Sequence, residues 1–287
     1  MDWRPAADLA AIRQRSDLLA TVRRFFSDRN ILEVETPLLC CSGITDPSIE
    51  PFTASCGDGG RSSRFLQTSP EYAMKSLLEW YRPGFDHHQL MAEVAALVGG
   101  VLGERPVEKY SYRQLFQQRL ALDPFTAPTA ELQSVVRRHL DPGGLSGDRD
   151  LWLDLLMSHV LEPRLGCDSL CFIYDYPASQ AALSRVVQAG GVAVGQRFEL
   201  YVDGVELANG YCELTDAVEQ RQRFERDNAL RRTRGQSERP VDEYLLAALE
   251  HGLPDCSGVA LGIDRLLMLV TGASNIKDVL AFDWQRC

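Results

Sequence analysis

The feature that most restricts the fold of this chain is the dipeptide Asp203-Gly204, which separates two stretches of alternating apolar and polar residues. Asp-Gly in such a setting is the strongest short-range signal for a β-hairpin with a two-residue type I′ turn. We therefore expect strands at 192–202 and 205–213 that pair antiparallel. The length of the turn also fixes the register, because it determines which residues of the two strands lie opposite each other.

The register predicted from this turn places two glutamates on one face of the hairpin. Tyr201 would face Glu206, and Glu199 would face Ala208, so the two glutamates become diagonal neighbours. Two carboxylates this close repel each other unless one is protonated or a cation lies between them. Such oxygen ligands suit Mg²⁺, above all where phosphates complete its coordination. The alternative is a solvent-facing hairpin whose glutamates only increase solubility.

A second candidate for phosphate binding is a predicted strand-turn-helix at 256–271, with the turn at Gly262. Asp264 and Arg265 would lie in the first turn of the helix. An arginine there can lie beside the unpaired backbone N–H groups of the helix start and bind a phosphate chain. The alternative is an ordinary strand-turn-helix with an arginine on the surface.

The apolar spacing elsewhere predicts strands towards both ends of the chain and helices in its middle. Further strands are expected at 31–36, 65–68 and 169–174, and helices at 6–29, 70–79, 86–102, 111–119, 129–140, 149–161, 216–234 and 242–251. This order indicates an α+β fold with a mainly antiparallel sheet flanked by helices. We expect a single domain over 1–287, with 85–162 as a mainly helical insertion.

Charge and hydropathy exclude several classes of protein. The formal net charge of −10 argues against charge-driven binding to nucleic acid, which needs a cationic surface. No apolar stretch approaches the roughly 18 residues that span a bilayer. The first residues carry charges throughout and lack the apolar core of a signal peptide. We therefore expect a cytoplasmic protein without a membrane segment.

Four segments resemble the motifs of one enzyme family and occur in the same order. Residues 25–37 resemble motif 1 of class II aminoacyl-tRNA synthetases, a helix and strand that build a dimer interface, and 258–265 resemble motif 3. Residues 68–72 (Thr-Ser-Pro-Glu-Tyr) and 206–214 (Glu-Leu-Ala-Asn-Gly-Tyr-Cys-Glu-Leu) resemble the branch that uses lysine. The resemblance implies a class II catalytic core, ATP as co-substrate and a homodimer.

Within that branch the chain is most similar to the stand-alone ligases that join a lysine to elongation factor P. Ala208 replaces the glycine usual in the tRNA synthetases, and the segment 254–258 (Pro-Asp-Cys-Ser-Gly) resembles these ligases. The motif 1 helix starts almost at residue 1, so we expect neither an anticodon-binding OB-fold nor tRNA as a partner. The resemblance implies that lysine, preferably β-lysine, is activated as an adenylate and transferred to a lysine side chain of elongation factor P.

The resemblance assigns ATP to the hairpin and to the strand-turn-helix. Glu199 and Glu206 would hold Mg²⁺ on the phosphates of ATP, in agreement with the hairpin register. Arg265 would contact the γ-phosphate, next to Gly262 in the turn. Glu206 and Arg265 would therefore be the catalytic residues, acting through position and charge and not as nucleophiles.

The resemblance assigns the lysine pocket to residues from three segments: Glu71, Glu79, Tyr81, Asn209, Tyr211 and Glu213. Glu71 would bind the amino group near the substrate carboxylate, and Glu79, Tyr81 and Glu213 would receive the distal ammonium. Carboxylates suit both ends of lysine because a buried ammonium needs a paired anion. Without substrate they would repel one another, and at least one would have a raised pKa.

One geometric condition follows from these assignments. Glu206 and Glu213 are seven residues apart, so on an unbroken strand they would point to opposite faces. Both can enter one site only if the strand contains a bulge or kink. Gly210 is the residue where we expect it.

Motif 2 of the family has no counterpart in this chain. In the family, a helix similar to 69–77 is followed by motif 2, which consists of two strands and their loop and is about 30 residues long. A segment similar to 79–83 comes after motif 2. This motif contains an Arg-Asn-Glu run that binds the α-phosphate and an Asn-Pro-Glu-Phe run that stacks on adenine. Here Leu78 leads directly into Glu79, and neither run occurs elsewhere.

Two explanations of this gap are open: the segment is deleted from the protein, or it is missing only from the sequence as read. A true deletion would impair activation of the amino acid. The first alternative function is then a pseudo-synthetase that binds lysine or a translation factor without chemistry. The second is a fragment similar to lysyl-tRNA synthetase that acts on tRNA.

Overall fold

A seven-stranded sheet forms the centre of the computed structural model, which describes residues 4–55, 63–77 and 80–283. The strands follow the order β4 (Tyr81–Pro83), β10 (Cys256–Leu261), β9 (Val205–Cys212), β8 (Val192–Val202), β6 (Leu170–Pro177) and β5 (Val107–Ser111), and β7 (Val186–Ala189) pairs with β8. Among the strand pairs of the described residues, only β5 and β6 run parallel. The predicted α+β class with a mainly antiparallel sheet is confirmed.

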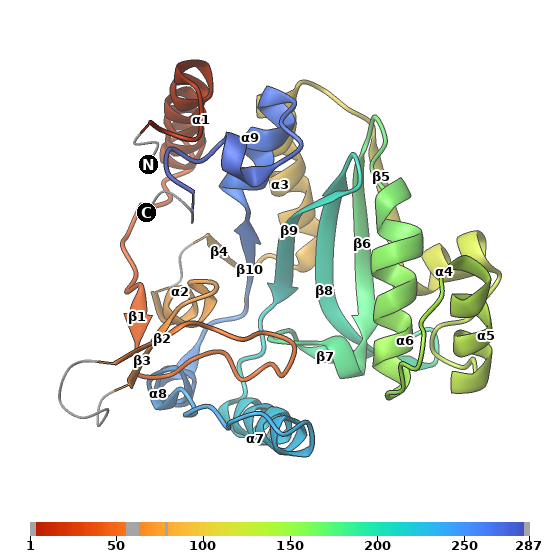
Figure 1. Cartoon of the computed structure of the whole chain (residues 1–287). Helices are drawn as coiled ribbons and strands as arrows, with labels where there is room; N and C mark the ends of the chain where they lie inside the picture. The colour runs from red at the N-terminus through yellow and green to blue at the C-terminus, as the bar shows by residue number, and fades with distance from the viewer. Residues whose placement is uncertain (1–3, 56–62, 78–79, 284–287) are drawn as a thin grey trace.

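The helices surround this sheet (Figure 1). They are α1 (Leu9–Ser27), α2 (Glu71–Leu77), α3 (His87–Leu102), α4 (Tyr112–Leu120), α5 (Thr129–His139), α6 (Arg149–Leu156), α7 (Ala217–Thr233), α8 (Glu243–Gly252) and α9 (Ile263–Thr271). A π-helical turn, Met157–Leu161, extends α6. Helix α3 contacts β8, β9 and β10, and α9 packs between α1 and the sheet. No helix of the described ranges combines the length and the apolar character needed to cross a membrane.

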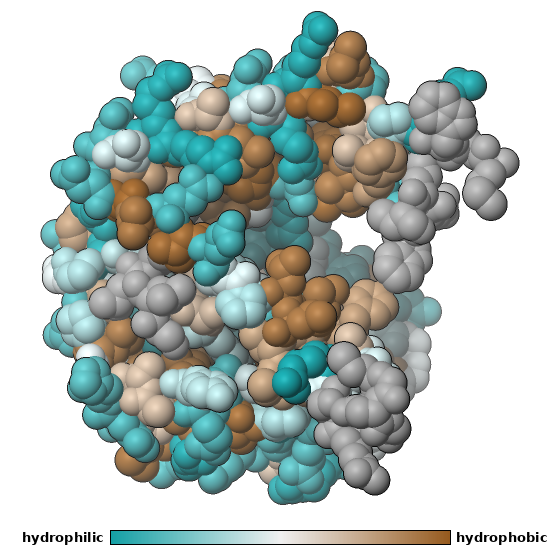
Figure 2. Space-filling view, turned by 90° about the vertical axis from the view of Figure 1, so that its left-hand side faces the viewer, coloured by the Kyte–Doolittle hydropathy of each residue, from teal (hydrophilic) through white to brown (hydrophobic). Residues whose placement is uncertain are grey.

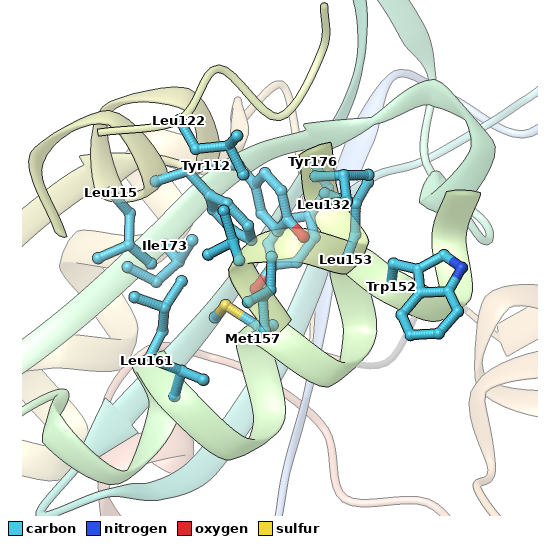
Figure 3. Packing of buried hydrophobic residues seen from close by; sticks show 14 of the residues in the cluster. Tyr112, Leu115, Leu122, Leu132, Trp152, Leu153, Met157, Leu161, Ile173 and Tyr176 are labelled. Carbon is cyan, nitrogen blue, oxygen red and sulfur yellow. The ribbon is translucent and has the colours of Figure 1, made fainter. Parts of the chain in front are cut away.

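Both faces of the sheet are covered by apolar side chains. On one face, Phe172 and Phe198 pack with Leu90 of α3. On the other, Ile173 and Tyr176 lie in a cluster with residues from α4, α5 and α6 (Figure 3). Because neighbouring residues of β6 point to opposite faces, this strand is buried on both sides. The sheet is thereby held rigidly where it carries the site described below.

A small separate sheet has the order β1–β3–β2, formed by Leu39–Cys40, Ser63–Leu66 and Thr53–Ser55. Large apolar side chains on and beside it are exposed to solvent: Leu38, Leu39, Phe52 and Leu66. Figure 2 views the side of the molecule that carries α1 and this sheet, and shows apolar residues gathered there.

The strand predicted at 31–36 does not form. This segment has no regular secondary structure and pairs with none of the described strands, and Leu32 is 77% exposed. Alternation indicates a strand only where a neighbouring strand is available to complete its hydrogen bonds. The prediction was wrong because no strand of the described residues pairs with 31–36.

Candidate active site

The hairpin of β8 and β9 carries most of the predicted site residues, and its turn forms as predicted. Tyr201 faces Glu206, in agreement with the predicted register. Further along, Glu199 faces Asn209 and not Ala208, so this part of the prediction was wrong. The reason is that β9 contains one more residue than β8 between these two pairs, which is a β-bulge.

The bulge is at Leu207 and not at Gly210, where we expected it. The carbonyl oxygen of Leu207 accepts a hydrogen bond of 2.8 Å from the backbone N–H of Gly262, at the start of α9. Because the extra residue changes the alternation, Glu206 comes to the same face of the sheet as Asn209. The later residues of β9 alternate onward from there, so that Glu213 shares this face as well.

Arg197 links the residues of this face and was not among those predicted. Its Nη2 contacts the carboxylate of Glu199, its Nε donates a 3.1 Å hydrogen bond to Oδ1 of Asn209, and its guanidinium lies 4.7 Å from the ring centre of Tyr176. Burial alone would lower the pKa of Arg197, but the Glu199 carboxylate raises it. The two-residue spacing of Arg197 and Glu199 was the sequence signal, because such residues share one face of a strand.

Glu199 is held on its other oxygen by two tyrosines. The hydroxyl groups of Tyr176, at 2.6 Å, and of Tyr201 both donate to Oε2. Both tyrosine rings belong to the apolar cluster of α4, α5 and α6. This part of the chain therefore positions the carboxylate, which is itself buried.

Glu206 and Arg265 form an ion pair at the edge of the same face. Arg265, in the first turn of α9, donates to the backbone oxygen of Glu206 at 2.8 Å and to its Oε2 at 3.3 Å. Burial and the nearby Glu199 raise the pKa of Glu206. Both side chains keep solvent access, so both can exchange partners.

A third carboxylate, Glu162, lies close to this pair. Its Oε1 accepts a hydrogen bond of 3.2 Å from the hydroxyl group of Tyr201. Burial and then the Glu199 carboxylate raise the pKa of Glu162 to about 7. Even so, the part of the chain that the structure describes contains no group of three acidic, histidine or cysteine side chains able to hold a metal ion. A cation here would need other ligands, such as phosphate oxygens.

The residues assigned to the lysine pocket surround a small cavity of about 10 Å³, which is roughly the space of one water molecule. Its walls include Glu71, Tyr81, Tyr211 and Glu213. The structure therefore brings together four of the residues predicted for this pocket. The predicted Glu79 lies outside the described residues.

Close packing of β4 against β10 positions the ring of Tyr81. Gly258 lies opposite Tyr81 in the sheet, and a Cβ at this glycine would be 2.6 Å from a ring carbon. Any residue other than glycine at position 258 would therefore displace the ring of Tyr81. Burial, followed by the carboxylates of Glu213 and Glu71, raises the pKa of the Tyr81 hydroxyl well above its ordinary value.

Glu213 is paired with a lysine of the chain itself. The Nζ of Lys75, on α2, lies 2.8 Å from Oε2 of Glu213, and neither side chain is exposed. Burial raises the pKa of Glu213, and Lys75 opposes this shift. Burial and the Glu213 carboxylate raise the pKa of Glu71 to about 7. Two carboxylates thus line this cavity, and one of them is paired with the buried ammonium of Lys75.

Comparison with known proteins identifies the family. The family model of tRNA synthetases class II (D, K and N) matches residues 101–286, more than half of the 287 residues. The chain therefore belongs to this family of class II tRNA synthetases.

Curated relatives narrow the similarity within the family. Among them are the elongation factor P–(R)-β-lysine ligases of Sodalis glossinidius (strain morsitans) and Pseudoalteromonas translucida (strain TAC 125), each 43% identical, and of Salmonella gallinarum, 42% identical. The alignments cover 99% of this chain and 98% of each relative. The similarity predicted from the sequence motifs is thus confirmed over nearly the whole chain.

The alignment lengths also show that positions of the relatives have no counterpart in this chain, in a total that matches the size of motif 2. The alignment with the Sodalis glossinidius ligase extends over 319 positions, whereas this chain has 287 residues. At least 32 of those positions therefore have no residue in this chain. This number agrees with the size of the segment that the motif pattern places between Lys75 and Glu79.

Proposed function

We propose that this chain is an ATP-dependent ligase that activates lysine, preferably β-lysine, and transfers it to a lysine side chain of elongation factor P. The observation that carries the proposal is the similarity, over almost the whole length of both chains, to elongation factor P–(R)-β-lysine ligases. The proposed compartment is the cytoplasm, since the acceptor is an elongation factor. A single catalytic domain over 1–287, with 85–162 as an insertion, is part of the same proposal.

The proposed reaction has two steps. The carboxylate of lysine attacks the α-phosphate of ATP, a P–O bond forms, and pyrophosphate leaves. The amine of the acceptor lysine then attacks the carbonyl carbon of the mixed anhydride, an amide forms, and AMP leaves. Neither step requires a nucleophilic side chain, because position and charge supply the catalysis.

In the proposed ATP site, Arg265 binds the γ-phosphate beside Gly262, and Glu206 with Glu199 holds Mg²⁺. Mg²⁺ bound there would neutralise charge on the phosphates. The partly exposed carboxylate of Glu206 fits this role, because a cation there would offset the burial and the repulsion by Glu199 that raise its pKa. Glu199 is already held by Arg197 and two tyrosines, so its proposed role requires one of these contacts to be exchanged.

In the proposed amino-acid site, Glu71 binds the amino group near the carboxylate, and Glu213 with Tyr81 binds the distal ammonium. Asn209 and Tyr211 line the same pocket, and Glu79 is assigned to it by resemblance alone. The raised pKa of Glu71 supports the proposal, since a second ammonium would balance its charge.

A second candidate function is a pseudo-synthetase that binds lysine or a translation factor without chemistry. The observation that favours it is the total of at least 32 aligned positions that have no residue in this chain. Loss of one donor to the reacting phosphate lowers the rate by about 10²–10³. Sequencing the gene across codons 75–79 and measuring lysine-dependent exchange of pyrophosphate into ATP distinguish the two functions.

We further propose that the chain works as a homodimer through the side that carries 20–37. Exposed apolar residues on this side support the proposal: Leu32, Leu38, Leu39, Phe52 and Leu66. Exposed apolar side chains gathered on one side of a molecule are typical of a protein interface. Burying it against a second copy would remove these side chains from water.

A further inference from the structure

The side chain of Lys75 lies where the proposed function expects the distal ammonium of the substrate. Its Nζ is 2.8 Å from Oε2 of Glu213, and both side chains are fully buried. The cavity beside Glu213 measures only about 10 Å³, which is the space of roughly one water molecule. The four-carbon chain of a free lysine does not fit into the space that remains.

This ion pair has few of the hydrogen bonds that usually accompany buried charges. Among the described residues, neither carboxylate oxygen of Glu213 accepts a well-aligned hydrogen bond. A further contact of Lys75 with the described residues is a long one, 3.4 Å, to the carbonyl oxygen of Leu183. Lys75 therefore compensates the charge of Glu213 without satisfying its lone pairs. A ligand ammonium with its three donors could serve the carboxylate at least as well.

Charged groups also surround the cavity. Glu71 and Glu213 provide two carboxylates to its walls. The Lys75 ammonium pairs with Glu213, and the guanidinium groups of Arg197 and Arg185 also act on Glu71 and Glu213. The phenol groups of Tyr81 and Tyr211 complete the walls and can donate or accept hydrogen bonds but carry no charge. Because Arg197 and Arg185 form their ion pairs with Glu199 and Asp255, the cavity remains chemically suited to primary ammonium groups.

We propose that Lys75 is an internal occupant of the ammonium site: its side chain fills the position that the distal ammonium of a free lysine would take. Free lysine then binds only when Lys75 withdraws with α2, and the two ammonium groups compete for Glu213. This inference rests on the proposed function for the assignment of the pocket to lysine. A purely structural ion pair would not compete with the ligand.

Lys75→Ala tests the proposal, because it removes Cγ, Cδ, Cε and Nζ, the atoms that n-propylamine replaces. We expect n-propylamine to raise the melting temperature of this variant in a saturable manner, and the uncharged isostere n-propanol to have no such effect. The matched control is Lys75→Ala with Glu213→Gln, in which n-propylamine should not stabilise. If Lys75→Ala does not remain folded, the same comparison is made on refolding yield with and without n-propylamine. Equal effects in both variants would overturn the proposal.

Calorimetry with free lysine then separates an internal occupant from a structural ion pair. We expect Lys75→Ala to bind lysine at least tenfold more tightly than the unchanged chain, and n-propylamine to weaken this binding by competition. Binding of n-propylamine without binding of lysine, or lysine binding unaffected by n-propylamine, would contradict the inference. Pyrophosphate exchange by the unchanged chain tests the proposed function separately. Competitive binding without exchange would leave the inference standing and reject the ligase activity.

Discussion

The guanidinium of Arg265 lies 3.3 Å from the carboxylate of Glu206, and both side chains keep solvent access. The contact joins two segments 59 residues apart, the hairpin and the first turn of α9. Both residues are proposed to bind ATP, one through its phosphates and the other through Mg²⁺. Without nucleotide, Glu206 therefore supplies the negative charge that Arg265 would receive from a phosphate. Arg265 in turn supplies the positive charge that Glu206 would receive from Mg²⁺.

Replacing Glu206 by Gln tests its role in ATP binding. The change keeps the shape of the side chain but removes the charge proposed to hold Mg²⁺. We expect pyrophosphate exchange to fall by about 100-fold, the usual effect of removing one group that stabilises developing charge, while lysine binding is unchanged. The matched control is Glu225→Gln, at an exposed glutamate of α7. Unchanged affinity for Mg²⁺ and ATP, measured by calorimetry, would reject the assignment.

The Lys75–Glu213 ion pair should show strong coupling in a double-mutant cycle. Lys75→Met or Glu213→Gln alone leaves one buried charge without a partner, so we expect each to lower the free energy of unfolding by about 3–5 kcal/mol. The double variant should lose less than the sum of the two, with a coupling of at least about 1 kcal/mol. Lys109→Met, at an exposed lysine, serves as control. Additive effects in urea unfolding would contradict the pairing.

The raised pKa of Glu71 predicts that stability depends on pH. The folded pKa is about 7 against an ordinary value of 4.5, so between these values the folded chain binds a proton that the unfolded chain has released. The contribution of Glu71 is therefore most favourable at low pH and falls as the pH rises from 4.5 to 7, by no more than about 3 kcal/mol.

Glu71→Gln removes this titrating group and should flatten the decline in unfolding free energy between pH 4.5 and about pH 7. Glu162→Gln is the matched variant, because the pKa of Glu162 is also raised to about 7. Each substitution should remove the contribution of its own residue to the decline of unfolding free energy with pH. A decline as steep in Glu71→Gln as in the unchanged chain would show that Glu71 titrates normally.

The proposed homodimer predicts that an apolar surface becomes buried in solution. Sedimentation at micromolar concentration should give a dimer, and Leu32→Glu or Phe52→Glu should shift the equilibrium toward monomer by placing a charge in the interface. Leu145→Glu is the control, because this leucine is 44% exposed in the segment between α5 and α6. A monomer in the unchanged chain would contradict the proposal.

Local signals explain which parts of the fold could be predicted. The Asp203-Gly204 turn fixed both strands of the hairpin, because turn geometry depends on adjacent residues alone. The bulge at Leu207 could not be predicted, since its carbonyl is held by Gly262 from a distant element. The strand expected at 31–36 failed for a similar reason, because strand formation depends on a partner elsewhere in the chain.

In the site, too, local motifs could be predicted from the sequence, whereas contacts between distant segments could not. Family motifs indicated Glu71, Tyr81, Tyr211 and Glu213, and the structure brings these four residues to one cavity. The buried position of Lys75 was not predicted, because a lysine in a short helix is normally exposed. Its partner Glu213 is 138 residues away in the sequence, and no local pattern indicates such a pair.

Lysine-dependent exchange of labelled pyrophosphate into ATP by the 287-residue chain tests the central claim most directly. The assay reports formation of the adenylate and does not need the acceptor protein. We predict exchange above the background without amino acid, greater with β-lysine than with α-lysine, and lowered by about 100-fold in Glu206→Gln. Absence of exchange under conditions where calorimetry detects binding of both lysine and ATP would contradict a ligase and support the pseudo-synthetase.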